Sequence, residues 1–327
     1  MHGVIPYVIK RLAWAPLILF IVSIVTFSLG RFGPGDPARI IAGQNPDPIA
    51  IERIREERGL NDHFVVQYGN YMINALQADF GESMLYRGQD IKDVVFPRLW
   101  VTIQYNMIAV VLIFALGIPA GIWMARYQGT WKDPVSMSGL LLFAAIPVLI
   151  MVPILQYIFA LQLNWLPTGG WETKEFFGWL ELGIFSDTII MPTIALTLPG
   201  IAGVARLMRS QVLEVMDQDY VRTAQAKGLN EKTVMIRHVA RNAMLPISTV
   251  MGFALIGLLS GSIFLETLLG IPGIGFYAFE AVGSRDYDGI MAIVLIGASA
   301  FIVANVIIDI TYSFIDPRIR LGEEASK

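Results

Sequence analysis

The sequence predicts an all-α integral membrane protein. It has six membrane-spanning helices, a helical insert after the first span and a short cytoplasmic helix between the fourth and fifth. The 327 residues are 55% hydrophobic, with a mean hydropathy of +0.58. Soluble domains are only about 45–50% apolar, even when glycine is counted. Charged residues make up 16% of the chain, and the basic ones concentrate in segments that six spans place on one side, where positive loops are retained.

The spans are identified as apolar runs long enough to cross a bilayer. Lys10 and Arg11 precede the first run, which is longer than a signal-peptide core and lacks a small-x-small cleavage site, so an uncleaved span is expected. Six spans place both chain termini in the cytoplasm. The predicted spans cover residues 12–29, 101–125, 135–161, 188–208, 247–265 and 289–314.

A polar insert, 33–99, separates the first two spans and lies outside the cytoplasm in this topology. Asp47 as a cap, followed by Pro48, predicts the start of a helix that Gly59 ends. A second helix is predicted from an apolar face at helical spacing. The residues of that face are Tyr68, Tyr71, Met72 and Ala75.

A basic segment, 206–246, separates the fourth and fifth spans and is expected in the cytoplasm. Asp219 is expected to cap a helix over 220–227, because its carboxylate can accept hydrogen bonds from first-turn amides. Gly228 stands where a left-handed residue would end that helix. The basic residues of the segment are Arg206, Arg209, Arg222, Lys227, Lys232, Arg237 and Arg241.

A second helix is expected in the same segment. Asn230 would cap it, and it would run to about Met244, because Pro246 prevents its continuation. Two capped helices indicate a folded, shaped segment rather than a flexible tether. The alternative is an amphipathic loop that rests on lipid headgroups.

The residues of this segment resemble the cytoplasmic coupling loop of ABC-importer permeases, and more narrowly the branch that imports dipeptides, oligopeptides and nickel. Where the superfamily has Glu-Ala-Ala, three residues and Gly, this chain has Arg222-Thr223-Ala224 and Gly228, a departure usual in the peptide branch. Similar stretches occur along most of the chain. They are Pro34-Gly35-Asp36-Pro37, Asp219 to Leu229, Arg237-His238, Arg241 to Pro246, Glu266-Thr267, Gly270 to Gly275 and Asp316-Pro317-Arg318.

The resemblance implies one transmembrane domain over 1–327, with an extracytoplasmic insert at 33–99 and a coupling loop at 209–246. It also implies that the short helix lies in a groove of a separate ATPase subunit. Ala224→Asp, which places a charge in that contact, is then expected to uncouple uptake without preventing membrane insertion. The implied coupling residues are Asp219, Tyr220, Val221, Arg222, Thr223, Ala224, Lys227 and Gly228.

The partners implied by the resemblance are a second homologous permease, two ATPase subunits and an extracytoplasmic substrate-binding protein. The setting is the lipid bilayer of a bacterial or archaeal cytoplasmic membrane. The insert would serve as a docking surface or only as an extracytoplasmic cap. Glu266 and Thr267 would line the mouth of the pathway, where Glu266 could touch a substrate amine. Alternatively, Glu266 is a structural acid that holds the glycine-rich turn.

The chain lacks the motifs of an enzyme. The segment nearest to a phosphate-binding loop, 228–233, has no second glycine, so ATP and Mg²⁺ are expected to bind partner chains. Cysteine is absent, and His2, His63 and His238 are scattered, so no metal site is predicted. No nucleic-acid partner is expected. Within the family the cargo could also be nickel or an oligosaccharide, and outside it the chain could be an ATP-independent channel.

Overall fold

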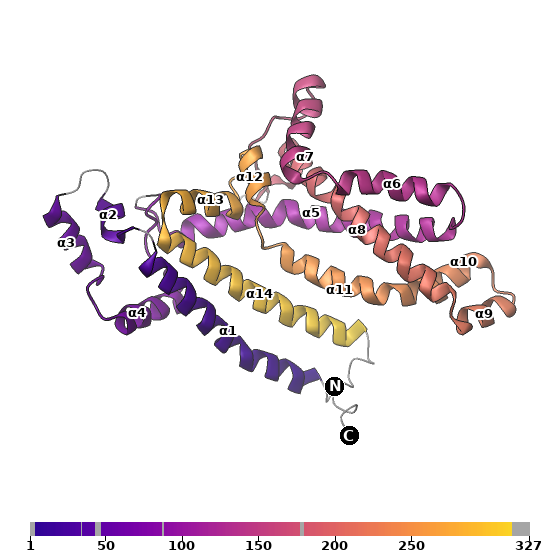
Figure 1. Cartoon of the computed structure of the whole chain (residues 1–327), viewed down its shortest axis with the longest axis horizontal. Coiled ribbons are helices and arrows are strands. Elements are labelled where there is room, and N and C mark those ends of the chain that lie inside the picture. The colour runs from indigo at the N-terminus through magenta and orange to yellow at the C-terminus, as the bar shows by residue number, and fades with distance from the viewer. Residues whose placement is uncertain (1–3, 34, 43–46, 87, 177–179, 316–327) are drawn as a thin grey trace. The chain divides into compact units, whose positions relative to one another are not determined.

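The structure is a computed structural model that describes residues 4–315 except 34, 43–46, 87 and 177–179. Helices dominate it, so the predicted all-α class is confirmed (Figure 1). The chain divides into two compact units. The first is Met1–Trp100, Leu259–Ile263 and Pro272–Lys327, and the second is Val101–Leu258 and Phe264–Ile271. The similar stretch at Asp316-Pro317-Arg318 lies outside the described residues, as does Pro34.

In the first unit, two long helices lie side by side: α1 (Val4–Phe32) and α14 (Tyr287–Ile315) (Figure 1). Gly33 sits against the ring of Tyr287, since a Cβ at Gly33 would lie 2.9 Å from its Cε1. The end of α1 is therefore level with the start of α14. The other helices here are α2 (Pro37–Ala42), α3 (Pro48–Glu57), α4 (Phe64–Leu76), the first part of α5 (Ile91–Arg126) and α13 (Ile274–Ser284).

The insert forms the helices that the sequence predicts. The carboxylate of Asp47 accepts a hydrogen bond from the Ile49 amide at 3.1 Å, Pro48 is the first residue of α3, and Gly59 follows its end with φ +60°. On α4, the rings of Tyr68 and Tyr71 lie 5.6 and 5.3 Å from that of Phe27 on α1. Met72 and Ala75 are half-buried on the same face. Both predictions are confirmed.

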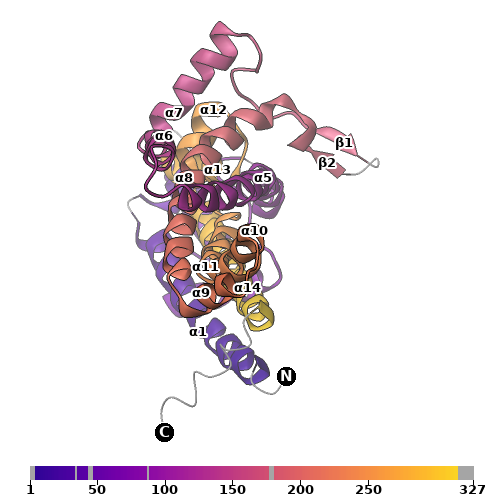
Figure 2. The ribbon, with the colours of Figure 1, turned by 90° about the vertical axis from the view of Figure 1, so that its right-hand side faces the viewer.

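The second unit contains the rest of α5 and the helices that lead into and out of the basic segment. A small antiparallel hairpin, with Lys174 opposite Leu182, also forms here, and the sequence did not predict it (Figure 2). The elements are α6 (Lys132–Ala144), α7 (Val148–Leu155) with a π-helical turn (Gln156–Gln162), β1 (Lys174–Phe176), β2 (Leu180–Leu182), α8 (Ile190–Met216), α9 (Asp219–Ala226), α10 (Glu231–Thr233) with a second π-helical turn (Val234–Ala240), α11 (Arg241–Gly257) and most of α12 (Ile263–Leu269).

Among the described residues, four helices are long and apolar enough to cross a membrane. Two broken pairs, α6 with α7 and α12 with α13, raise the number to six if each pair is one span. The predicted third span, 135–161, is not one straight helix, because α6 and α7 meet in it at a 94° bend. The physical reason is Pro147, which has no N–H and disfavours helical backbone in the preceding residue.

The predicted fifth span, 247–265, is also wrong as one helix. Helix α11 ends at Gly257, and α12 begins only at Ile263. Glycine costs about 1 kcal/mol more than alanine inside a helix; Gly257 is the last residue of α11, and Gly261 lies in the break. A Cβ at Gly261 would lie 2.3 Å from the backbone nitrogen of Gly275, so the position also requires glycine for close approach.

Several predicted helix ends lie elsewhere. Helix α5 begins at Ile91 rather than at 101, and its 36 residues give a length of about 54 Å. Helix α8 runs to Met216, so Arg206 and Arg209 lie on a helix rather than in a loop. Pro246 lies inside α11 and does not end it. The flanking Ala243 and Ile247 are both fully buried on one face of α11, and their packing outweighs the single hydrogen bond that proline removes.

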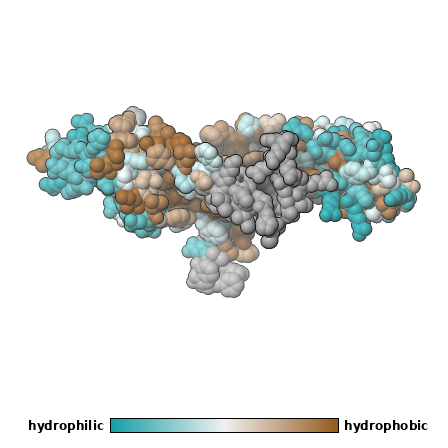
Figure 3. All heavy atoms as spheres, turned by 90° about the horizontal axis from the view of Figure 1, so that it is seen from below, coloured by the Kyte–Doolittle hydropathy of each residue, from teal (hydrophilic) through white to brown (hydrophobic). Residues whose placement is uncertain are grey.

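Glycines set the distance between α5 and α8. A Cβ at Gly121 would lie 2.6 Å from the carbonyl oxygen of Ala205, and one at Gly117 would lie 2.9 Å from the Cβ of Val204. Small residues of this kind allow helix backbones in membranes to approach closely. On the surface, hydrophilic residues gather around α3 in the first unit and around α9 and α10 in the second unit (Figure 3).

Gly121→Leu is expected to destabilise the second unit by about 1–3 kcal/mol, because the backbone of α8 cannot move away from the new side chain without losing its packing. The measurement is the thermal unfolding temperature of the purified chain in detergent. Gly203→Leu on α8 is the matched control, since no atom lies within 4 Å of a Cβ built there. Equal unfolding temperatures for the two variants would contradict the packing argument.

Candidate functional site

Helix α9 is a short helix at the end of α8. It starts at Asp219, and the residue before it, Gln218, makes no side-chain cap hydrogen bond. The prediction that Asp219 caps the helix is therefore wrong: Asp219 belongs to the first turn, where its fully exposed negative charge is favourable to the helix dipole and lies 4.0 Å from the guanidinium of Arg222. Gly228, with φ +75°, ends the helix as predicted. Asn230 also caps α10 as predicted, since its side chain accepts a hydrogen bond from the Thr233 amide at 3.1 Å.

The two faces of α9 have different surroundings. Val221 and Ala224 are only 1% and 5% exposed, and both belong to a hydrophobic core cluster that includes Val212 of α8 and Ala243 of α11. The opposite face is solvent-exposed, and the side chain of Arg222 on it is 69% exposed. The other exposed residues of the helix and its end are Asp219, Tyr220, Thr223, Gln225, Ala226, Lys227 and Gly228.

Hydrogen bonds hold α9 in place beside α11. The side-chain amide of Asn242 donates to the hydroxyl of Tyr220 at 3.0 Å and to the carbonyl of His238 at 2.8 Å. The hydroxyl of Thr223 donates to the carbonyl of Asp219 at 2.9 Å, one turn earlier in the helix. The exposed face of α9 is thus presented on a fixed support.

A charged pair ties α8, the helix that leads into α9, to α6. The guanidinium of Arg209 donates two hydrogen bonds to the carboxylate of Asp133, at 2.7 and 2.6 Å. The side chain of Asp133 is only 8% exposed, and bidentate pairs of this kind are strong and directional. The sequence analysis missed this pair, because the two residues are far apart in the chain and no local pattern joins them.

The second candidate site surrounds Glu266 on α12. Its side chain is fully buried and accepts hydrogen bonds from the hydroxyls of Tyr105 at 2.5 Å and Thr102 at 3.0 Å, both on α5. The hydroxyl of Thr267 is buried and makes no hydrogen bond to any group in the described part of the chain. The ring of Tyr105 lies 6.4 Å from that of Trp171, edge to face. The carboxylate thereby connects α12 to α5.

The backbone of α12 also packs closely against the backbone at Gly169 and Gly170. The amide of Gly170 donates to the carbonyl of Leu269 at 2.6 Å, and a Cβ at Gly169 would lie 2.3 Å from the same oxygen. The side-chain amide of Gln156 donates to the carbonyl of Thr168 at 2.7 Å. These contacts place α12 against the segment that follows the π-helical turn after α7.

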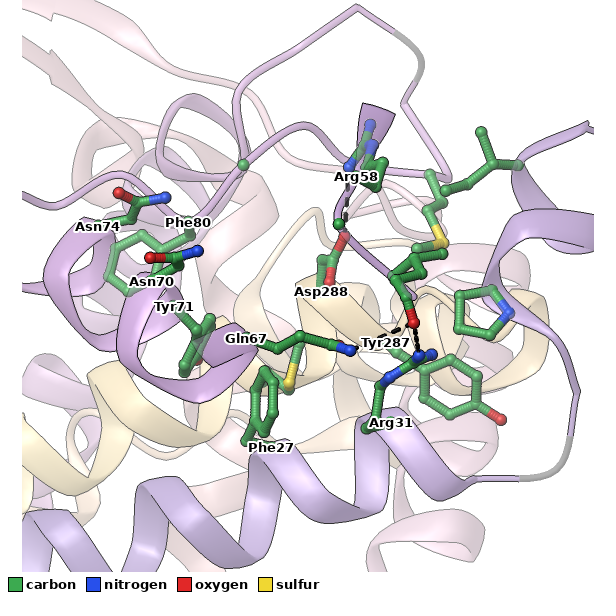
Figure 4. A pocket seen from close by; sticks show the side chains of 18 of the residues that line it. Phe27, Arg31, Arg58, Gln67, Asn70, Tyr71, Asn74, Phe80, Tyr287 and Asp288 are labelled. Carbon is green, nitrogen blue, oxygen red and sulfur yellow. Dashed lines mark hydrogen bonds and ion pairs between the residues drawn. The ribbon is translucent and has the colours of Figure 1, made fainter. Parts of the chain in front are cut away.

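The first unit contains a cavity of about 240 Å³ that the sequence analysis did not anticipate (Figure 4). Several of its polar groups are paired. Arg31 donates to the carbonyl of Leu60, as does Gln67 at 3.2 Å, and the guanidinium of Arg58 lies 3.6 Å from the carboxylate of Asp288. The hydroxyl of Tyr71 is buried without a hydrogen-bond partner in the described part of the chain, and this burial raises its pKa.

Comparison with known proteins shows which protein family the chain belongs to. Residues 117–321 match the family described as binding-protein-dependent transport system inner membrane component, and residues 4–84 match its N-terminal companion. The chain belongs to this family. It is an ABC-importer permease of the peptide and nickel branch, as the resemblance in its loop indicated.

Curated relatives resemble the permease over almost its full length. It is 37% identical to the dipeptide transport system permease protein of Alkalihalophilus pseudofirmus, over 96% of this chain and 99% of the relative. It is also 37% identical to the glutathione transport system permease protein of Escherichia coli, over 96% and 98%. A solved inward-facing methionine ABC transporter shares the fold with a TM-score of 0.53 at 13% identity, over 68% of this chain and 96% of that one.

The expectation for Ala224 needs correction. Its methyl group packs inward on the permease's own core, so Ala224→Asp would bury an unpaired carboxylate rather than place a charge on a partner contact. An unpaired buried charge costs about 3–5 kcal/mol. The variant is therefore expected to give less folded permease in the membrane, measured by protease resistance of the 217–246 region. Ala226→Asp is the matched control, because Ala226 is exposed on the same helix; equal resistance would contradict the assigned orientation of α9.

Tyr105→Phe is expected to lower the thermal stability of the purified permease in detergent. It removes the 2.5 Å hydrogen bond to a fully buried carboxylate, at a cost of about 1–3 kcal/mol. Tyr157→Phe is the control, because Tyr157 is 57% exposed. If the two variants unfold at the same temperature, Tyr105 does not stabilise Glu266.

Proposed function

We propose that this permease is a transmembrane subunit of an ATP-driven importer for dipeptides and oligopeptides. It forms half of the translocation pathway with a second homologous permease. Two ATPase subunits bind ATP and Mg²⁺ on the cytoplasmic side, and a binding protein delivers substrate from outside. The observation that carries the proposal is the two-faced α9, which buries Val221 and Ala224 in its own core and presents Arg222 and Thr223 to solvent.

The exposed face of α9 suits contact with a separate protein. Its small residues, Thr223 and Ala226, permit close approach, and Arg222 and Lys227 offer charged contacts at the edges. Interfaces of this kind derive specificity and speed of association from complementary charge. We place α9 in the cytoplasm with both termini, and the insert outside, because the positive segments then lie on the retained side.

Movement at α9 would reach the membrane through α8. The two helices are separated only by Asp217 and Gln218, and the core cluster packs α9 directly against the end of α8. Helix α8 is close-packed on α5 at Gly121 and bonded to α6 through Arg209 and Asp133. A displacement of α9 by closing ATPase subunits would therefore act on three membrane helices together.

For Glu266 the geometry supports the structural role more strongly than contact with a substrate amine. The carboxylate is fully buried and bonded by Thr102 and Tyr105. With Thr267, it would line the pathway mouth only in a conformation in which α12 has moved away from α5. The peptide cargo is supported by the relatives that are named as dipeptide and glutathione permeases. Uptake of labelled dipeptides by the assembled transporter tests that class.

The proposed contact between α9 and an ATPase subunit is tested by cross-linking. Because the chain contains no cysteine, an introduced cysteine is its only reactive thiol. Thr223→Cys, in membranes with the complete transporter, is expected to cross-link to an ATPase subunit through a short thiol–amine reagent. Ala224→Cys is the matched control: it is one residue away but faces the core, so it is expected to give no product. A Thr223→Cys variant that reacts with the reagent, yet captures no ATPase subunit, would refute the coupling role.

A second experiment tests the orientation of the permease in the membrane. A membrane-impermeant thiol reagent is expected to label Thr223→Cys in inside-out vesicles and not in right-side-out vesicles. Lys174→Cys, on the hairpin of the segment after α7, is expected to give the opposite pattern. Labelling of both variants from the same side would overturn the topology while leaving the fold unchanged.

A further inference from the structure

An open groove of about 470 Å³ in the first unit is lined by three arginines and a single acid. Arg39 comes from α2, Arg55 from α3, and Arg285 from the turn between α13 and α14, while Asp36 precedes α2. We refer to this as the arginine groove. Its lining carries three positive charges against one negative charge, in a protein that has a net charge of −3.

Asp36, the acidic residue of the arginine groove, is already paired with Arg55. The carboxylate of Asp36 accepts a hydrogen bond from the guanidinium of Arg55 at 2.5 Å and another from the Ala38 amide at 3.1 Å. Arg55 also contacts Glu52 at 3.2 Å. In contrast, neither Arg39 nor Arg285 has an acidic partner within 4.0 Å in the described part of the chain. Two exposed guanidinium groups therefore remain available to an anion.

The backbone holds Arg285 over the arginine groove. Arg285 adopts the left-handed conformation, with φ +58°, and its amide donates to the carbonyl of Val282 at 3.3 Å. Its guanidinium Nη1 would lie 3.3 Å from a Cβ at Gly35, which itself has φ +121°. Gly35 thus leaves the space that the guanidinium fills.

The span ends set the depth of the arginine groove in the membrane. Gly35 follows the end of α1 at Phe32, and Arg285 precedes the start of α14 at Tyr287. At up to about 3.5 Å per residue, both lie within roughly 10 Å of the span ends. Headgroups extend about 5–8 Å beyond the hydrocarbon on each side, so the groove is within reach of headgroups if α1 and α14 leave the hydrocarbon at these ends. Near the end of α1, the apolar side chains of Leu29 and Phe32 are 67% and 75% exposed.

We propose that the arginine groove binds the phosphate of an anionic phospholipid headgroup. The planar guanidinium can donate two parallel hydrogen bonds to phosphate oxygens, which is the geometry that arginine recognises best. Leu29 and Phe32 would contact the acyl chains. A single exposed ion pair in water contributes little, so a small free anion is disfavoured relative to a lipid that the membrane holds at high local concentration.

The test is native mass spectrometry of the full-length permease released from bilayers that mix phosphatidylglycerol and phosphatidylcholine. The wild type is expected to retain phosphatidylglycerol preferentially. An anionic surface favours each basic residue by about fivefold, so the loss of two charges in R39Q/R285Q is expected to reduce the preference about 25-fold. R53Q is the matched control, because Arg53 is exposed on α3 and does not line the groove.

Further variants and conditions distinguish a lipid from a free anion or a protein partner in the arginine groove. R39K/R285K keeps the charge but loses the bidentate geometry, and an intermediate preference supports the proposal even if the glutamine variant folds poorly. Equal retention of the two lipids by the wild type overturns it. Displacement of the lipid by millimolar inorganic phosphate would assign the groove to a free anion instead. Unchanged lipid retention in R39Q/R285Q, together with weaker docking of the binding protein, would assign it to a protein partner.

Discussion

Close packing around α8 is the constraint on which the second unit depends. Gly117 and Gly121 bring α5 against its backbone, and the Arg209–Asp133 pair joins it to α6. Inside a membrane, hydrophobicity does not drive helices together, because lipid tails are as apolar as leucine. Contact between small residues and a satisfied charged pair must supply the specificity. The helix that carries α9 is therefore held by interactions that tolerate little displacement.

Helix α9 has a buried face and an exposed face within eight residues. Its inner residues are part of the hydrophobic core that α8 and α11 also build, so they determine where the helix lies. Its outer residues contribute almost nothing to that core and are available to a partner. The arginine groove of the first unit follows the same logic, because Arg55 and Asp36 satisfy each other and hold the local structure, while Arg39 and Arg285 face outward.

Local signals in the sequence predicted well wherever one residue decides the backbone. Asp47 and Pro48 begin α3, Gly228 ends α9, and Asn230 caps α10, each through a hydrogen bond or a φ value that its own residue type favours. The same reasoning failed for Asp219, because several nearby residues could have opened the helix. It failed for Pro246, because packing of Ala243 and Ile247 outweighs the loss of one hydrogen bond.

The sequence by itself determined the membrane class, the helical content and the family, because hydropathy, charge distribution and a short polar motif are all carried by neighbouring residues. Only the tertiary structure decided which side of α9 is free, how Glu266 is bonded, and that Arg209 meets Asp133. Each of these depends on groups from distant parts of the chain that come together only on folding. A face at helical spacing shows that two residues point the same way, but burial alone shows whether that direction is toward the core or toward a partner.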